Sequence, residues 1–319
     1  MSTTLEDHDV FTNTVTRLSR QSVEKHFDAY TDVEWDSPEM AIDEKDPRFR
    51  LWSFDPLAAT DWYRSQPPEV QSRVALHRIA AAMRIGWEFE NVLQRGLLLY
   101  AFWLPNQRPE FRYIHHEVIE ESQHTLMFQE VIDRTGLDVQ GMPRRMKVAS
   151  HVVMLLSRAL PPLFFLFVLG GEDPVDHLQR RQLRSGECHP VIERIMRIHV
   201  TEEARHISFA RQYLKRSVPK LGPMRRQVLG MTAPLLFGTM ARLMAFPPSH
   251  LARAYEVPRD QLRRSLRTPE SRKLLADSVA KPRRLCNELG LVSKPARRLW
   301  KLMQVWDEDD RDIGAADPG

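Results

Sequence analysis

The residues best suited to chemistry lie between His199 and His206, where the chain reads HVTEEARH inside a helix-favouring run from about residue 191 to 218. At about 100° of rotation per residue, His199, Glu203 and His206 fall within a stripe about 60° wide. One helix face therefore carries two imidazoles and a carboxylate, all of which can bind a metal ion. We interpret this face as one side of a metal-binding site.

A second stretch has nearly the same form, because the chain reads EESQH from Glu120 to His124 in a helix-favouring run from about residue 109 to 135. The chain has only two Glu-Glu pairs, and in each the second Glu is followed by His three residues later. Rotation alone does not choose between Glu120 and Glu121, since each forms a stripe about 60° wide with Glu117 and His124. The Glu-x-x-His spacing selects Glu121, and Glu120 is then expected to face solvent or to lie just outside the ligands.

Glu-x-x-His motifs on two helices, with one carboxylate from each of two others, are the arrangement by which a four-helix bundle holds two iron ions. Carboxylate and imidazole ligands suit iron or manganese, so a di-iron centre and a mixed manganese/iron centre both remain open. The chain lacks paired cysteines, which argues against a structural zinc site. The zinc-protease pattern is absent too, because HEVI from His116 is followed by Glu120 and not by His.

The first long helix is predicted from Glu69 to about Trp103, beginning after a Pro-Pro pair. Glu90 lies on its apolar stripe, whereas Glu88 lies about 160° away by the same rotation. Glu90 is therefore the candidate ligand from this helix. The alternative is that the stripe is drawn wrongly and Glu90 is a surface residue.

The most apolar part of the chain runs from residue 152 to 169, and Arg158 and a Pro-Pro pair interrupt it. The uninterrupted pieces are shorter than the roughly 20 residues that a membrane span needs, so we predict a buried helix. Its phenylalanines pack in the core or line an apolar substrate pocket. The run ends in GGEDP, and Glu172 is our candidate for the third carboxylate. Alternatively, Asp173 caps a new helix that has Pro174 at its first position.

Composition predicts an all-α protein, since 42% of residues are hydrophobic, only 13 are glycine and no run alternates convincingly with period two. We divide the chain into a partly extended N-terminal arm, a helical core, a basic helical extension and an acidic disordered tail. These segments cover residues 1–50, 51–250, 251–306 and 307–319, respectively.

Charge and cysteine content limit the partners. Residues 251–305 hold 14 Lys or Arg against 5 Asp or Glu, and residues 306–319 hold 1 against 6. The basic segment lacks interleaved aromatic residues, so a solvated helical tail is expected and nucleic acid is not. Cys188 and Cys286 are far apart in the chain, and the first residues lack the layout of a signal peptide. These features favour a cytoplasmic protein without disulfides or transmembrane segments.

The assembled pattern resembles the AurF-like p-aminobenzoate N-oxygenases, a family of ferritin-like, non-haem di-iron proteins. The resemblance covers roughly residues 70–215. An offset of 82 residues superposes the two Glu-x-x-His motifs and places Glu117 on His199, so His199 is a third imidazole without a counterpart. A third histidine at this position is what distinguishes the family. The resemblance implies seven metal ligands, which also act in catalysis through the metal centre: Glu90, Glu121, His124, Glu172, His199, Glu203 and His206.

The same resemblance implies a ferritin-like four-helix-bundle core with additional N- and C-terminal helices. It implies two iron ions as cofactor, O2 as co-substrate, a small-molecule amine as substrate, an unidentified electron donor and a homodimer. The expected reaction oxidises an arylamine to the hydroxylamine, nitroso or nitro product. The alternatives are a di-iron hydroxylase or desaturase that acts at carbon of an apolar substrate, a ferritin-like iron-handling protein, and a helical scaffold without metal.

Overall fold

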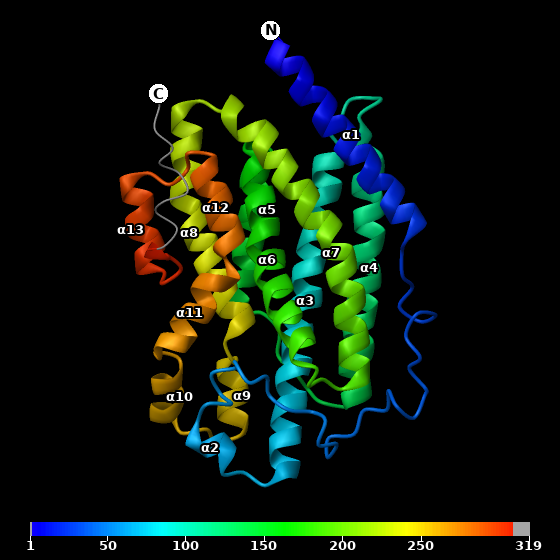
Figure 1. The fold of residues 1–319 in the computed structure, drawn as a ribbon, viewed down its shortest axis with the longest axis vertical. Helices are drawn as coiled ribbons and strands as arrows, with labels where there is room; N and C mark the ends of the chain where they lie inside the picture. Colours follow the sequence, from blue (N-terminus) through cyan, green and yellow to red (C-terminus); the bar gives the residue numbers. More distant parts are fainter. Residues whose placement is uncertain (1, 309–319) are drawn as a thin grey trace.

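The computed structural model describes the backbone of residues 2–308 and the side chains of residues 10–308, and every regular element in this range is a helix (Figure 1). The prediction of an all-α fold is confirmed. The predicted disordered tail falls almost wholly on residues 309–319, which lie outside the described residues.

Four long helices form the bundle: α3 (Pro68–Ala101), α4 (Pro109–Thr135), α6 (Pro161–Ser185) and α7 (Pro190–Ser217). Each begins at a proline, whose fixed φ and missing N–H suit the first position of a helix. The helices α4 and α6 end at Gly136 and Gly186, whose φ values are 64° and 68°. Short connections make α3 antiparallel to α4 and α6 antiparallel to α7, and each pair packs together closely (Figure 1).

The helix α6 continues through its Gly-Gly and Pro174 without a break, so the alternative in which Asp173 caps a new helix is wrong. Asp173 instead forms an ion pair with Arg211 of α7. The glycine at 171 is needed because a Cβ there would overlap the ring of Phe89 on α3. The helix therefore stays intact and lies close enough to α3 to place Glu172 inside the bundle.

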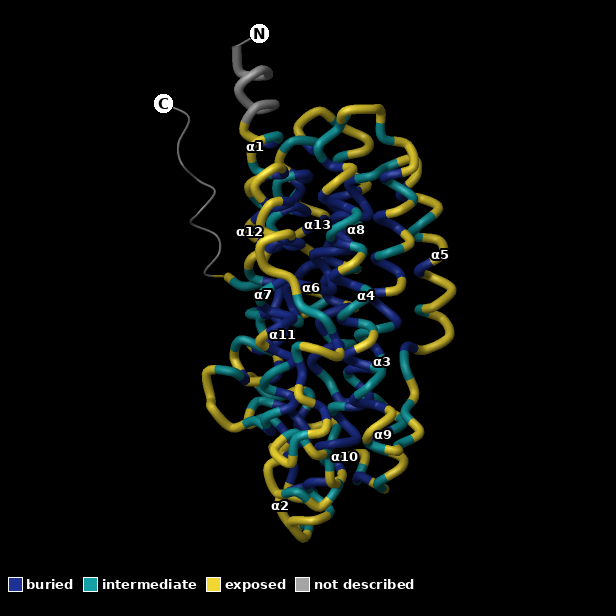
Figure 2. Tube along the Cα trace, turned by 90° about the vertical axis from the view of Figure 1, so that its right-hand side faces the viewer, coloured by how far each residue is buried: buried dark blue, intermediate teal, exposed yellow. Residues whose placement is uncertain are grey.

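The apolar run 152–169 is divided between two helices with different surroundings. Leu160 separates α5 (Arg144–Ala159) from α6, and the α6 part is buried as predicted. The α5 part is not, since Val152, Leu155 and Leu156 are 51%, 71% and 52% exposed. The prediction of one buried helix is thus wrong for residues 152–159, because α5 lies on the outside of the bundle and packs mainly on α6 (Figure 2).

The N-terminal segment begins with helix α1 (Ser2–Glu24), which packs on α4 and α7. Its Phe11, Val15 and Leu18 recur with helical spacing and are buried. Residues 25–60 then follow an irregular path over the bundle to the single turn of α2 (Asp61–Arg64). A partly extended arm was expected for residues 1–50, and its first half is the helix α1.

The chain after the bundle folds into one long helix and a series of shorter ones. Beyond the short 3-10 helix η1 (Val218–Lys220), the elements are α8 (Pro223–Ala245), α9 (Ser249–Ala254), α10 (Arg259–Ser265), α11 (Pro269–Ser278), α12 (Ala280–Glu288) and α13 (Lys294–Leu302). The helix α8 packs on α6, and α11 and α13 pack on α8. These helices cover the α6 side of the bundle.

One helical stretch among the described residues, Pro223–Ala254, is long and apolar enough to cross a membrane by length and composition. Of its most apolar window, 56% is buried inside the protein. A core helix passes the same test, so the stretch is only weak evidence of a membrane span.

Candidate metal centre

The bundle helices bring all seven predicted ligands to one place in the core. We call these residues the carboxylate–histidine cluster, and none is more than 2% exposed. The members come from all four long helices: Glu90 from α3, Glu121 and His124 from α4, Glu172 from α6, and His199, Glu203 and His206 from α7.

Possible ligand atoms in the cluster form overlapping groups in which all atoms lie within 4.8 Å of one another. One group contains Glu90, His124, His199 and Glu203, and another contains Glu90, Glu121 and Glu172. Such spacing suits side chains that share a metal ion.

Glu121 and Glu203 lie between the imidazoles of His124 and His206. Nδ1 of His206 is 3.1 Å from Oε1 of Glu121 and 3.0 Å from Oε1 of Glu203. Nδ1 of His124 is 3.3 Å from Oε2 of Glu121 and 3.4 Å from Oε1 of Glu203. Each carboxylate thus reaches both histidines, so Glu121 and Glu203 would help to hold both ions of a metal pair.

The cluster fits a pair of cations because several of its buried atoms have no hydrogen-bond partner in the part of the chain that the structure describes. Oε2 of Glu90, Oε1 of Glu172, Oε2 of Glu203 and Nδ1 of His199 accept or donate no hydrogen bond. A buried carboxylate without a partner is costly. Two divalent cations among these oxygen and nitrogen atoms would remove that cost, and the ligand types suit iron or manganese.

The titration behaviour of the cluster reflects the crowding of acidic groups. Burial and the neighbouring carboxylates raise the pKa of Glu90 and of Glu172 well above the ordinary value. Burial opposes the charging of His124, but hydrogen bonds with Glu121 and Glu202 outweigh it and raise the pKa of His124 to about 10. The cluster therefore retains protons that bound metal ions would displace.

The first Glu of each Glu-Glu pair supports the histidine on the opposite helix. Nε2 of His206 on α7 donates a hydrogen bond of 2.7 Å to Oε2 of Glu120 on α4. Nε2 of His124 on α4 donates one of 2.9 Å to Oε2 of Glu202 on α7. Because Nε2 of each ring is engaged, Nδ1 is left facing the cluster, which is how outer carboxylates orient metal-bound imidazoles.

Arg205 joins these two outer carboxylates. Its Nη2 lies 2.9 Å from Oε1 of Glu120 and 3.4 Å from Oε1 of Glu202, and the side chain is buried. The positive guanidinium offsets the two negative charges that contact His206 and His124 from outside the cluster. Of the two positions predicted for Glu120, the exposed one is wrong, since Glu120 is 2% exposed.

Four residues of this region were not among the predicted ligands: Glu117, Glu120, Glu202 and Arg205. The presence of two consecutive Glu residues in both motifs was the sequence signal that could have pointed to a role for Glu120 and Glu202. Glu117 shares the helix stripe of Glu121 and lies within 4.8 Å of Glu121 and His206, with its Oε2 unpartnered. Burial raises the pKa of Glu117 to about 8. It would supply one further oxygen ligand beside Glu121 and His206.

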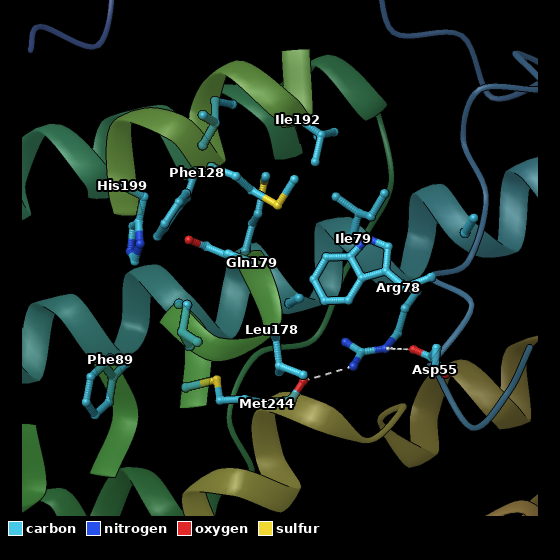
Figure 3. A pocket seen from close by; sticks show the side chains of 18 of the residues that line it. Asp55, Arg78, Ile79, Phe89, Phe128, Leu178, Gln179, Ile192, His199 and Met244 are labelled. Atoms are coloured by element: carbon cyan, nitrogen blue, oxygen red, sulfur yellow. Dashed lines mark hydrogen bonds and ion pairs between the residues drawn. The ribbon is translucent and has the colours of Figure 1, made fainter. Parts of the chain in front are cut away.

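A cavity that is partly open to solvent reaches the cluster at Glu90, Glu172 and His199. Figure 3 shows His199 beside the apolar side chains of its wall. Its walls come mainly from α3, α6 and α7 and from the irregular segment after α1. The side chains of Phe89, Phe128, Ile192 and other apolar residues line it. A small organic molecule inside it would lie against the cluster and largely out of water.

Comparison with known proteins places this geometry in context. Residues 9–290 match the family model described as p-aminobenzoate N-oxygenase AurF. The uncharacterized proteins Mb0909 of Mycobacterium bovis and Rv0885 of Mycobacterium tuberculosis are each 43% identical over 290 residues. The matched region covers 90% of this chain and 85% of each relative. No solved structure matches the chain significantly.

Proposed function

The chain belongs to the p-aminobenzoate N-oxygenase AurF family, and we propose that it oxidises the nitrogen of an amine with O2. The family has a ferritin-like di-iron fold, and the buried carboxylate–histidine cluster indicates a di-iron oxygenase. The observation that carries the proposal is the meeting of seven buried ligands from four helices at the inner end of an apolar cavity.

The reaction we propose converts an arylamine, O2, two protons and two electrons into an aryl hydroxylamine and water. One oxygen atom forms a bond to nitrogen, and the other leaves as water with both protons. An external two-electron reductant, whose identity is open, supplies the electrons. Further rounds would give the nitroso and nitro products.

Bound iron would supply the redox chemistry with O2, while the protein provides ligands, orientation and a dry site. Glu90, Glu121, Glu172 and Glu203 offset the charge of two divalent ions, and the three histidines add neutral nitrogen ligands. Glu120 and Glu202 hold two of the imidazoles in place from outside. The apolar cavity excludes water around the substrate.

The apolar lining of the cavity also favours a second function. Its walls are mostly aliphatic and aromatic, which also suits oxidation at carbon by a hydroxylase or desaturase. The two functions differ in the atom that receives oxygen. A ferritin-like iron-handling role would require no organic substrate at all.

To test the proposal, the protein is loaded anaerobically with iron(II), reduced and exposed to isotope-labelled O2 with a panel of arylamines and fatty acids. We expect mass spectrometry to find labelled oxygen on the nitrogen of an arylamine. Label only on carbon would overturn N-oxygenation in favour of a hydroxylase. Iron oxidation without any labelled product would favour iron handling.

We also propose that the protein acts in the cytoplasm as a homodimer. Support for the dimer comes from large exposed apolar side chains on the outer sides of α3 and α4: Leu98, Phe102, Ile119 and Leu126. Hydrogen bonds from Gln94 to Thr125 and from Ser122 to Gln94 join the two helices here. Light scattering should give twice the chain mass for the wild type and the chain mass for Ile119→Lys. A monomeric wild type would contradict the dimer.

A further inference from the structure

The cavity beside the carboxylate–histidine cluster holds few polar groups away from the cluster. Its apolar wall includes Phe89, Phe128, Ile192 and Leu178 (Figure 3). The polar side chains that line the rest of it are Arg50, Asp55, Arg78 and Gln179. In so apolar a cavity, these groups determine which polar substituents a ligand can carry.

The buried charges among these groups offset each other. Nε of Arg78 lies 3.1 Å from Oδ2 of Asp55, and Nη2 of Arg78 donates a 3.0 Å hydrogen bond to the carbonyl of Met244. Both members of the ion pair are buried. Arg78 therefore has little positive charge to offer to an anionic ligand, and separating it from Asp55 would leave a buried charge unpaired.

Arg50 is the remaining cation of the cavity wall, and its side chain is exposed. Its Nε donates a 3.0 Å hydrogen bond to the carbonyl of Pro47. Because its charge is in contact with solvent, its attraction for an anion is screened by water and salt. A carboxylate inside the cavity thus lacks a buried counter-ion.

Gln179 is the amide side chain of this wall, and its amide oxygen is buried without a hydrogen-bond partner among the described residues. It lies on α6 seven residues after Glu172, which places both on one helix face about 10 Å apart along the axis. Figure 3 shows the amide extending into the cavity on the side of His199 and Phe128. A buried amide oxygen without a hydrogen-bond donor destabilises the folded protein, and a ligand that supplies a donor would remove this cost.

We propose that Gln179 is a specificity-determining residue, and that the substrate is a neutral arylamine with a hydrogen-bond donor at the end opposite its amine. The inference rests on the proposed function in placing the amine at the cluster. Gln179 then accepts the hydrogen bond of a hydroxyl or carboxamide group, and the apolar wall contacts the ring. The self-paired Arg78 and Asp55 disfavour arylamines that carry a carboxylate.

The test compares three ligands by calorimetry on the full chain, loaded with iron(II) under nitrogen so that no turnover occurs. The ligands are 4-aminobenzyl alcohol, its apolar isostere 4-ethylaniline, and p-aminobenzoate. The variant Gln179→Met removes the amide at similar size. The control Gln94→Met changes a half-buried glutamine on α3 that does not line the cavity. Circular dichroism checks that both variants are folded.

We expect the ratio of the dissociation constant of 4-ethylaniline to that of 4-aminobenzyl alcohol to fall about three- to tenfold in Gln179→Met, as for the loss of one hydrogen bond. The ratio should not change in Gln94→Met, and p-aminobenzoate should bind the wild type most weakly of the three. An unchanged ratio in Gln179→Met, tightest binding of p-aminobenzoate, or no binding of the alcohol would overturn the proposal.

Failure of this inference is distinguishable from failure of the proposed function. Selective binding that depends on Gln179, without oxidation of the amine after O2 is added, would leave the specificity assignment intact and remove N-oxygenation. Oxidation of arylamines without any dependence of binding on Gln179 would support N-oxygenation and remove the specificity assignment.

Discussion

Nε2 of His206 donates a hydrogen bond to Oε2 of Glu120 across 2.7 Å, and this bond joins the two helices that carry the Glu-Glu motifs. The reciprocal bond from His124 to Glu202 makes the arrangement nearly symmetric. Each motif thus supplies one carboxylate to the cluster and one to the histidine of the opposite motif. This reciprocal arrangement explains why each motif contains two consecutive Glu residues.

Glu120→Ala should weaken iron(II) binding about 10- to 100-fold, because His206 loses the partner that orients its ring. An anaerobic titration followed by calorimetry measures the affinity. The control is Glu130→Ala on the same helix, which removes only the partly exposed ion pair with Arg134. Similar affinities for Glu120→Ala and Glu130→Ala would show that the hydrogen bond to His206 does not support the site.

Arg205→Met should lower the free energy of unfolding by about 3–5 kcal/mol, since it leaves the buried carboxylates of Glu120 and Glu202 without their cation. Urea denaturation measures the change. Arg197→Met on the same helix breaks an exposed pair with Glu193 and should cost less than about 1 kcal/mol. Equal effects of the two substitutions would contradict the role given to Arg205.

Gly171→Ala should destabilise the protein by about 1–3 kcal/mol, because the new methyl group would overlap the ring of Phe89 and force α6 away from α3. The adjacent Gly170→Ala is the control, since a Cβ there would lie 3.6 Å from Phe237, an ordinary contact. That change should be neutral or stabilise the helix by up to about 1 kcal/mol. Urea denaturation of both variants tests the close approach, and a neutral Gly171→Ala would rule it out.

His189 should make stability depend on pH. Burial, with Arg48 nearby, lowers the pKa of His189 to about 4, and its ring stacks on Phe49 at 4.2 Å. Since the folded protein favours the neutral ring, this contribution to stability is complete above the unfolded pKa of about 6.5 and declines as the pH falls toward 4.

His189 is the N-cap of α7, where its Nδ1 accepts a hydrogen bond from the backbone N–H of Val191. From about pH 7 to about pH 5, the wild type should therefore lose about 1–2 kcal/mol more stability than His189→Asn, whose side chain can cap α7 but does not titrate. Other pH-dependent groups, including the cluster, are shared by both proteins and cancel in this comparison. Urea denaturation at the two pH values gives the difference. Parallel losses in the two proteins would contradict the assignment.

The bundle was predictable because its signals are local. Helical spacing and prolines at the first position fix α3, α4 and α7 within a few residues, and rotation placed Glu90 rather than Glu88 on the inner stripe. The remaining long helix was misplaced, since one buried run was expected at residues 152–169 and α6 occupies residues 161–185. Glu88 is nevertheless buried, because the loop before α5 covers it and Met142 donates a hydrogen bond to it. That contact depends on the path of a distant segment.

The features that sequence reasoning missed depend on tertiary contacts. The outward position of α5 is set by the turn at Leu160, although residues 152–156 within it are all apolar. The partnership of Glu120 with His206 spans two helices and cannot be seen in the rotation of either. The helix α1 could have been found, since Phe11, Val15 and Leu18 have the spacing of an amphipathic helix.

The measurement that tests the account most directly is the amount of iron bound per chain after anaerobic loading and removal of free metal. Elemental analysis of the wild type should give about two iron ions per chain, as for a di-iron bundle. The double variant His124→Ala/His206→Ala, which removes one imidazole from each motif, should hold less than half of that. Less than one iron per chain in the wild type, or equal amounts in both proteins, would contradict the assignment of this cluster as a di-iron centre.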